Sequence, residues 1–111
     1  MELSALEQSR LAVVGLERDH CCVHDLSWRC DLDGADAVHH VAQRLREHGY
    51  AYREVTSGGL IELRHPQRHT IVLVASTGRV QIRLDRLTPS EQREALAIAL
   101  ALEVATAAAA P

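Results

Sequence analysis

The strongest constraint on the fold is the order of the secondary-structure signals from Asp25 to Ala105, which read strand, helix, three strands and helix. Residues 25–32 alternate between polar and apolar side chains, as a strand with one face in water does. Between Asp33 and Gly49 the apolar side chains recur at helical intervals, which indicates an amphipathic helix capped by Asp33. This order of elements predicts a small α+β domain.

The second half of the chain supplies the remaining strands. Residues 50–56 and 60–65 are separated by Ser57-Gly58-Gly59, which fits either a hairpin or one kinked strand. Residues 70–75 contain a continuous apolar run, and residues 79–85 alternate again after a tight turn. We therefore expect a two-layer sandwich with the order α-β-α-β-β-β-α. Its antiparallel sheet of three or four strands carries the helices mainly on one face.

Capping signals mark the first and last helices. The sequence Ser-Ala-Leu-Glu that begins at Ser4 is a capping-box pattern, and the helix that it starts is expected to reach about Glu17. Thr88 followed by Pro89 predicts the start of the final helix, which is expected to continue to about Ala105.

Strand alternation and helix periodicity also divide the side chains between core and surface. On each strand, one of the two alternating sets is assigned to the core. The expected core comprises Leu26, Trp28, Cys30, Val38, Val41, Leu45, Ile61, Leu63, Ile71, Leu73, Val80, Ile82, Leu84, Leu96 and Leu100.

The length of 111 residues is that of one domain. We treat residues 1–111 as a single unit, with residues 1–20 as the N-terminal helix and a loop, and residues 106–111 as a frayed tail. The N-terminus lacks the basic segment and long apolar stretch of a signal peptide. The alanine-rich end is interrupted by Glu103 and is too weakly hydrophobic to span a bilayer. We expect a cytoplasmic protein without membrane contact.

The net charge of −3 argues against nonspecific nucleic-acid binding by the whole molecule, although the charge is uneven. Residues 60–93 carry six arginines and three acids, so a nucleic acid or another anion is an alternative partner. One tryptophan and two tyrosines offer little surface for stacking bases. The candidate anion-binding residues are Arg64, His65, Arg68, His69, Arg79 and Arg83.

The apolar run in residues 70–75 presents apolar groups on both faces of its strand, whereas a two-layer fold covers only one face. The final helix also has more apolar residues than fit on one stripe. Exposed apolar patches mark interfaces, so we predict a homodimer, contact with another protein, or both. The alternative is a monomer in which residues 5–17 cover the sheet. The interface candidates are Val72, Val74, Ile98 and Leu102.

The densest group of metal-binding side chains lies shortly before the first predicted strand. It consists of His20, Cys21, Cys22 and His24. Thiolate and imidazole are ligands of zinc and copper. The spacing matches no zinc finger or ribbon, and no second pair follows, so the alternative is packed core cysteines with loop histidines. Three cysteines, an odd number, do not form a disulfide framework.

The sequence contains no nucleophile elbow, no phosphate-binding glycine loop and no helical pair of metal-binding histidines. We therefore expect a non-catalytic protein-binding or adaptor module that acts through an apolar interface as a homodimer, without a cofactor. One alternative is an anion or nucleic-acid binder that uses the arginine-rich hairpin and sheet face. A second alternative is a small metal or thiol site near Cys22.

Overall fold

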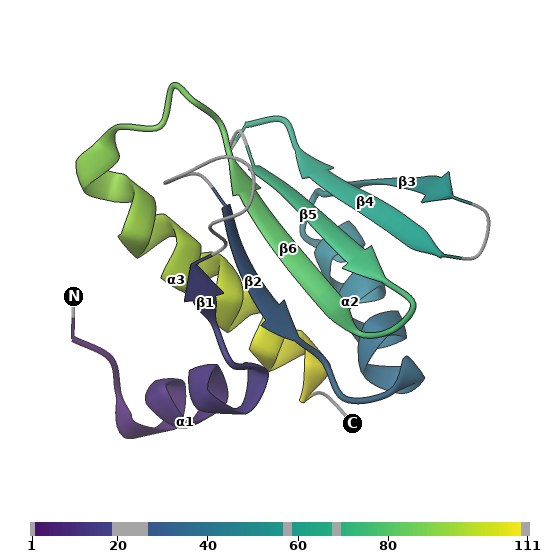
Figure 1. Cartoon of the computed structure of the whole chain (residues 1–111), viewed down its shortest axis with the longest axis horizontal. Coiled ribbons are helices and arrows are strands. Elements are labelled where there is room, and N and C mark those ends of the chain that lie inside the picture. The colour runs from purple at the N-terminus through teal and green to yellow at the C-terminus, as the bar shows by residue number, and fades with distance from the viewer. Residues whose placement is uncertain (1, 19–26, 57–58, 68–69, 110–111) are drawn as a thin grey trace.

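The computed structural model of the chain describes residues 2–18, 27–56, 59–67 and 70–109. Within these residues the chain forms three helices and one six-stranded antiparallel sheet (Figure 1). In chain order the elements are α1 (Ala5–Val14), β1 (Glu17–Arg18), β2 (Ser27–Asp31), α2 (Ala35–Glu47), β3 (Ala51–Thr56), β4 (Leu60–His65), β5 (Thr70–Ala75), β6 (Arg79–Leu84) and α3 (Ser90–Ala108). The predicted α+β class is confirmed, whereas the expected sheet of three or four strands is too small.

The strand order of the sheet is β1-β2-β6-β5-β4-β3, and every neighbouring pair is antiparallel. β3 and β4 pair as antiparallel neighbours, with a register shift between Glu54 and Thr56, so residues 51–56 and 60–65 are two strands and not one kinked strand. β2 pairs with β6, which is far away in sequence. This pairing places the early strand beside the last strand and joins the two halves of the chain in one sheet.

α1 begins as predicted and ends early. Ser4 Oγ accepts a hydrogen bond from the Glu7 backbone N–H (3.1 Å), and the Glu7 carboxylate accepts one from the Ser4 N–H (2.9 Å). The helix ends at Val14 because Gly15 adopts the left-handed conformation (φ 65°). The predicted end near residue 17 is therefore wrong, since Glu17–Arg18 instead pair with β2 as the edge strand β1.

The starts of α2 and α3 differ from the predicted caps. Asp33 does not cap α2, because Gly34 (φ 92°) occupies the N-cap position and no side chain bonds to the first turn. At α3 the N-cap residue is Pro89, in an extended conformation (φ −56°, ψ 137°), so the helix begins at Ser90. Thr88 instead uses its backbone oxygen, which accepts a hydrogen bond from the Arg93 side chain (3.0 Å).

The core lies between the sheet and the layer formed by α2 and α3. Buried residues that the sequence assigned to it are Trp28, Cys30, Val41, Leu45, Leu63, Val80, Ile82, Leu84 and Leu100. Val38, Ile61 and Leu96 are partly buried against this core. Leu26, also assigned to the core, lies outside the described residues.

The two faces of β5 are the reverse of those expected. Val72 and Val74 are 0% and 1% exposed and face the helices, whereas Ile71 and Leu73 are partly exposed on the other side of the sheet. Period-two alternation divides the side chains of β5 into two sets on opposite faces. It does not show which set faces the helices when both sets are apolar. The pairing register with β4 determines which side chains of β5 face the helices, because Val72 pairs with the fully buried Leu63 of β4.

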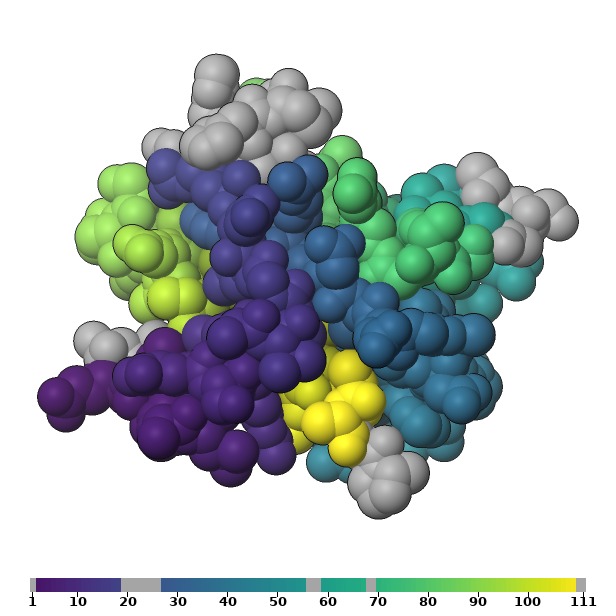
Figure 2. Space-filling model, turned by 60° about the horizontal axis from the view of Figure 1, so that its bottom comes forward, coloured from purple at the N-terminus to yellow at the C-terminus, as the bar shows by residue number. Residues whose placement is uncertain are grey.

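α1 packs beside α3 and does not cover the sheet (Figure 1). Val14 is buried in this contact, and Arg10 Nη1 donates a hydrogen bond to Thr106 Oγ1 (2.8 Å). The C-terminal end of α3, which continues beyond the predicted end to Ala108, lies between α1 and α2 (Figure 2). None of the described helices has the length and hydrophobicity needed to cross a membrane.

Candidate functional site

The side of the sheet opposite α2 and α3 faces the viewer in Figure 1, and no described helix covers it. Directly paired residues on neighbouring strands point to the same side of a sheet, so Ile71 and Leu73 define the side chains that share this surface. We call this surface the open face. Its side chains are those of Glu17, Ser27, Arg29, Asp31, Ala51, Arg53, Leu60, Glu62, Arg64, Ile71, Leu73, Ala75, Arg79, Gln81 and Arg83.

Two rows of paired residues cross the open face. The Leu73 row runs over all six strands in the order Arg53, Glu62, Leu73, Gln81, Arg29 and Glu17. The Ile71 row contains, in order, Ala51, Arg64, Ile71, Arg83 and Ser27. Ile71, Leu73 and Ala75 on β5, with Leu60 beside Ala75 on β4, form an apolar stripe that the polar residues flank.

Ion pairs neutralise the Leu73 row. Arg53 Nη2 lies 3.0 Å from Glu62 Oε2, and Arg29 Nη2 lies 3.0 Å from Glu17 Oε2. The Glu62 side chain is only 13% exposed, whereas that of Arg53 is 67% exposed. In both pairs the arginine is exposed to solvent, and surface pairs contribute about 0–1 kcal/mol each to stability. These pairs therefore shape the charge of the surface more than they stabilise the fold.

On both strands that flank β5, an arginine interacts with the side chain two residues earlier on its own strand. On β4, Arg64 Nε lies 3.4 Å from the oxygen Oε1 of Glu62, two residues earlier. On β6, Arg83 Nε donates to the oxygen Oε1 of Gln81, also two residues earlier (3.0 Å), and Gln81 Nε2 donates to Ser27 Oγ (3.0 Å). Among the described residues, no carboxylate lies within ion-pair distance of Arg83. The Ile71 row therefore contains two arginines whose Nε atoms interact with a neighbouring side chain. One of them, Arg83, lacks a charged partner among the described residues.

Three of the predicted anion-binding residues lie on the open face. Arg64 and Arg83 flank Ile71 in its row. Arg79 lies at the opposite end of β6, where its Nε is 3.7 Å from Asp31 Oδ1. The structure thus places the three arginines on one surface but not at one point.

His65 does not join these arginines, because its strand position points to the helix side. Its ring is buried and meets the Tyr50 ring edge-on, with centroids 5.0 Å apart. His65 Nδ1 accepts a hydrogen bond from the Gln67 N–H (3.3 Å). We interpret His65 as a packing residue of the β4 end. The two other candidates of this turn, Arg68 and His69, lie outside the described residues.

Of the four predicted interface residues, Val72 and Val74 are enclosed in the core and cannot contact a partner. Ile98 and Leu102 are partly exposed on α3. The residues that replace the two valines on the surface, Ile71 and Leu73, were missed by the sequence analysis. A signal for them existed, because the tight turn before β6 pairs them with the polar side of that strand.

The predicted metal or thiol residues His20, Cys21, Cys22 and His24 lie outside the described residues. Within the described part of the chain, no cluster of three or more histidine, cysteine, aspartate or glutamate side chains could hold a metal ion. Cys30 is fully buried, and this burial, followed by the charge of Asp31, raises the pKa of its thiol to about 12. The Cys30 thiol therefore stays protonated at neutral pH and is not an activated nucleophile.

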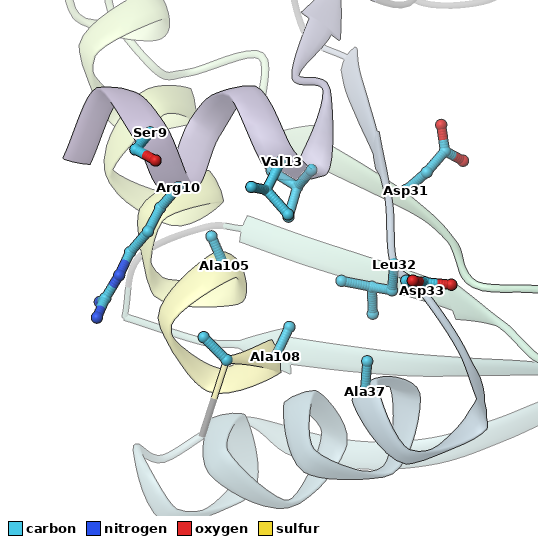
Figure 3. A pocket seen from close by; sticks show the side chains of 11 residues that line it. Ser9, Arg10, Val13, Asp31, Leu32, Asp33, Ala37, Ala105 and Ala108 are labelled. Carbon is cyan, nitrogen blue, oxygen red and sulfur yellow. The ribbon is translucent and has the colours of Figure 1, made fainter. Parts of the chain in front are cut away.

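A pocket of about 190 Å³ opens where α1, the end of α3, the start of α2 and the end of β2 meet (Figure 3). Its lining consists of Ser9, Arg10, Val13, Val14, Asp31, Leu32, Asp33, Ala37, Ala105, Ala108 and Ala109. Alanines leave this space where larger side chains would fill it. Arg10 extends away from the pocket toward its Thr106 partner, so polar groups do not converge inside it (Figure 3).

Protein-family models, curated proteins and solved structures contain no match to this chain.

Proposed function

We propose that this chain is a non-catalytic protein-binding module and that the open face of the sheet is its binding surface. The observation that carries the proposal is the apolar stripe around Ile71 and Leu73, which lies on a sheet face that no described helix covers. An apolar centre with a polar rim that is rich in arginine is the anatomy of a protein–protein interface. Arginine residues on both flanks of the stripe provide this rim.

A protein suits this face better than a nucleic acid does. The described aromatic side chains lie elsewhere: Trp28 and Tyr50 are buried on the helix side, and the Arg46 guanidinium covers the Tyr52 ring at 4.8 Å. Among the described residues, the open face thus offers no aromatic ring on which a base could stack. Its described side chains include five arginines and three acids, which leaves an excess of only two positive charges among them.

A different protein suits the face better than a second copy of the chain. If two copies stack their Ile71 rows by two-fold symmetry, β4 lies over either β4 or β6 of the other copy. Arg64 then opposes either Arg64 or Arg83 of that copy. Like charges opposed across an interface cost several kcal/mol, so self-association through this row is disfavoured.

The test compares two substitutions that introduce the same charge. Leu73→Asp changes the apolar stripe, and Leu87→Asp changes a residue that is 82% exposed in the loop before α3. Each tagged variant is incubated with lysate of the source cells after circular dichroism has confirmed folding. We expect a protein bound by the native chain and by Leu87→Asp to be lost with Leu73→Asp. Equal capture by both variants would refute the open face as the binding surface.

Sedimentation equilibrium of the same variants tests self-association. We expect a monomer mass for the native chain at micromolar concentration. A dimer that Leu73→Asp dissociates would instead assign the open face to a second copy.

A second candidate function is the binding of a nucleic acid or another anion, favoured by Arg83, which lacks a charged partner among the described residues. Phosphate contacts would make such binding weaken steeply with salt. Titration of duplex and single-stranded oligonucleotides at low salt tests it, and Arg83→Gln should then reduce the affinity and the salt slope.

A further inference from the structure

We infer that the partner of the open face presents an acidic amphipathic helix, with two carboxylates on Arg64 and Arg83 and apolar residues on Ile71 and Leu73. This inference rests on the proposed function. It adds the chemistry and the conformation of the partner.

The first argument is the spacing of the two arginines. β4, β5 and β6 are consecutive in the sheet, and Arg64, Ile71 and Arg83 are directly paired across them. Neighbouring strands lie about 4.8 Å apart, so the two arginine positions are about 10 Å apart with Ile71 midway. A ligand for this row needs two anionic groups at that separation and an apolar group between them.

A helix meets this requirement. Positions i and i+7 lie on the same face after two turns, about 10.5 Å apart, and positions i+3 and i+4 lie between them. In a strand, side chains on one face are about 7 Å apart for i and i+2 and about 13 Å apart for i and i+4. Glutamates at i and i+7 with leucines at i+3 and i+4 therefore fit the row better than an extended segment does.

The second argument is the way in which both guanidinium groups are held. Arg83 Nε donates a hydrogen bond to Gln81 Oε1, two positions earlier on its own strand. Arg64 Nε forms an ion pair with Glu62 Oε1 at 3.4 Å, also two positions earlier. The terminal nitrogens of each group point to no described partner. They can form the parallel pair of hydrogen bonds that arginine makes with a carboxylate. A side chain fixed in advance also loses less freedom on binding.

The third argument is charge. Glu62 is shared by Arg53 and Arg64, and Arg83 has an amide rather than a carboxylate as its partner. The described carboxylates therefore do not fully neutralise the positive charge of the Ile71 row. Two carboxylates from the partner would balance the excess of two positive charges on the open face. A basic or neutral helix would leave that charge unpaired in the interface.

The probe is a fluorescently labelled, alanine-rich peptide of about 16 residues, long enough to be partly helical. The first peptide carries glutamates at i and i+7 and leucines at i+3 and i+4. The second has the same composition, with both glutamates moved to the opposite face. The third carries lysines in place of the glutamates. Fluorescence anisotropy measures their binding to the full chain, and a single-stranded oligonucleotide serves as a nucleic-acid probe.

We expect the native chain to bind the first peptide at least about tenfold more tightly than the other two, as hydrogen bonds to charged groups allow. Arg64→Gln and Arg83→Gln should each weaken that binding about tenfold, and the double variant should remove the preference. Arg86→Gln makes the same charge change at an exposed residue outside the open face, and it should bind as the native chain does.

Equal affinity for the first two peptides, native affinity in Arg83→Gln, or no peptide binding at all overturns the helix assignment. Oligonucleotide binding that both arginine variants abolish, without peptide binding, replaces the helix by a nucleic acid. These failures differ from failure of the proposed function. If Leu73→Asp still loses its captured protein, the open face is a protein-binding surface and only the helical partner is wrong.

Discussion

The same strands form both faces of the sheet, but the two faces differ in side-chain composition and in exposure to water. On the helix side, the central residues of β4, β5 and β6 are aliphatic and almost inaccessible to water, as Leu63, Val72 and Ile82 show. On the open face, the residues between them combine an apolar stripe with paired arginines and acids. The comparison teaches that hydrophobicity along β5 does not by itself identify the core. The neighbouring strands decide, because only one side of each of them is apolar.

Truncating one leucine on each face gives the largest contrast. Leu63→Ala is expected to lower the free energy of unfolding by about 2–5 kcal/mol, because Leu63 is 0% exposed and leaves a cavity. Leu73→Ala on the next strand removes the same atoms from a partly exposed site and should cost about 1 kcal/mol. Urea unfolding measures both values. Equal losses would mean that the open face is covered as fully as the core.

The connection between sheet and helix layer depends on Gly78, which has a φ of 101° in the turn before β6. Its carbonyl accepts a hydrogen bond from the Leu32 N–H (2.7 Å), and a Cβ at this position would collide with the Leu32 carbonyl oxygen. Gly78→Ala is therefore expected to cost about 2–3 kcal/mol or more. Gly15→Ala is the control, since Gly15 also has a positive φ (65°, left-handed) but open space around an added Cβ, and it should cost about 1–2 kcal/mol. Urea unfolding that gives equal losses would place the strain in the backbone alone.

Cys30 gives the buried face a pH dependence. Burial raises the pKa of its thiol from 9.0 to about 12, so between these values the native state keeps a proton that the unfolded state loses. The contribution of Cys30 to stability is therefore fully present below pH 9 and is lost as the pH rises toward 12, by up to about 1.4 kcal/mol per pH unit. Unfolding curves at pH 8 to 11 measure this slope.

Cys30→Ala is the control for this slope, since it removes the titrating thiol. Its stability should vary less with pH than that of the native chain over the same range. A slope that survives the substitution would assign the pH dependence to other groups.

The sequence was sufficient to predict features that depend only on neighbouring residues, such as caps and the spacing of apolar side chains. The Ser4 capping box, the amphipathic α2 and the burial of Trp28 and Cys30 follow from spacing alone. It was insufficient to predict features that depend on pairing between strands far apart in the sequence. β1 exists because Gly15 ends the helix and Glu17–Arg18 then reach β2, and no periodicity marks a two-residue strand.

The candidate site was predictable only in part for the same reason. Arg79 and Arg83 were assigned to the polar side of their strand, and both lie on the open face. The flanking of Ile71 by Arg64 and Arg83 needs the register of three strands at once. Local patterns specify each strand but leave this register open, so the row could not be found before the sheet was assembled.

The smallest effect is expected from Glu62→Gln, which makes β4 resemble β6. On β6 the amide of Gln81 already holds Arg83, so a glutamine at position 62 retains an oxygen for Arg64 and loses only the charge that Arg53 and Arg64 share. The free energy of unfolding should fall by about 1 kcal/mol or less, and the difference should shrink as salt screens the charges. Glu47→Gln is the matched control, because its pair with Arg44 on α2 is long (4.0 Å) and exposed, and it should change stability even less. Urea unfolding at low and high salt measures both. A loss of several kcal/mol for Glu62→Gln would show that the charges of the open face stabilise the fold, and the division between a stabilising face and a binding face would then be wrong.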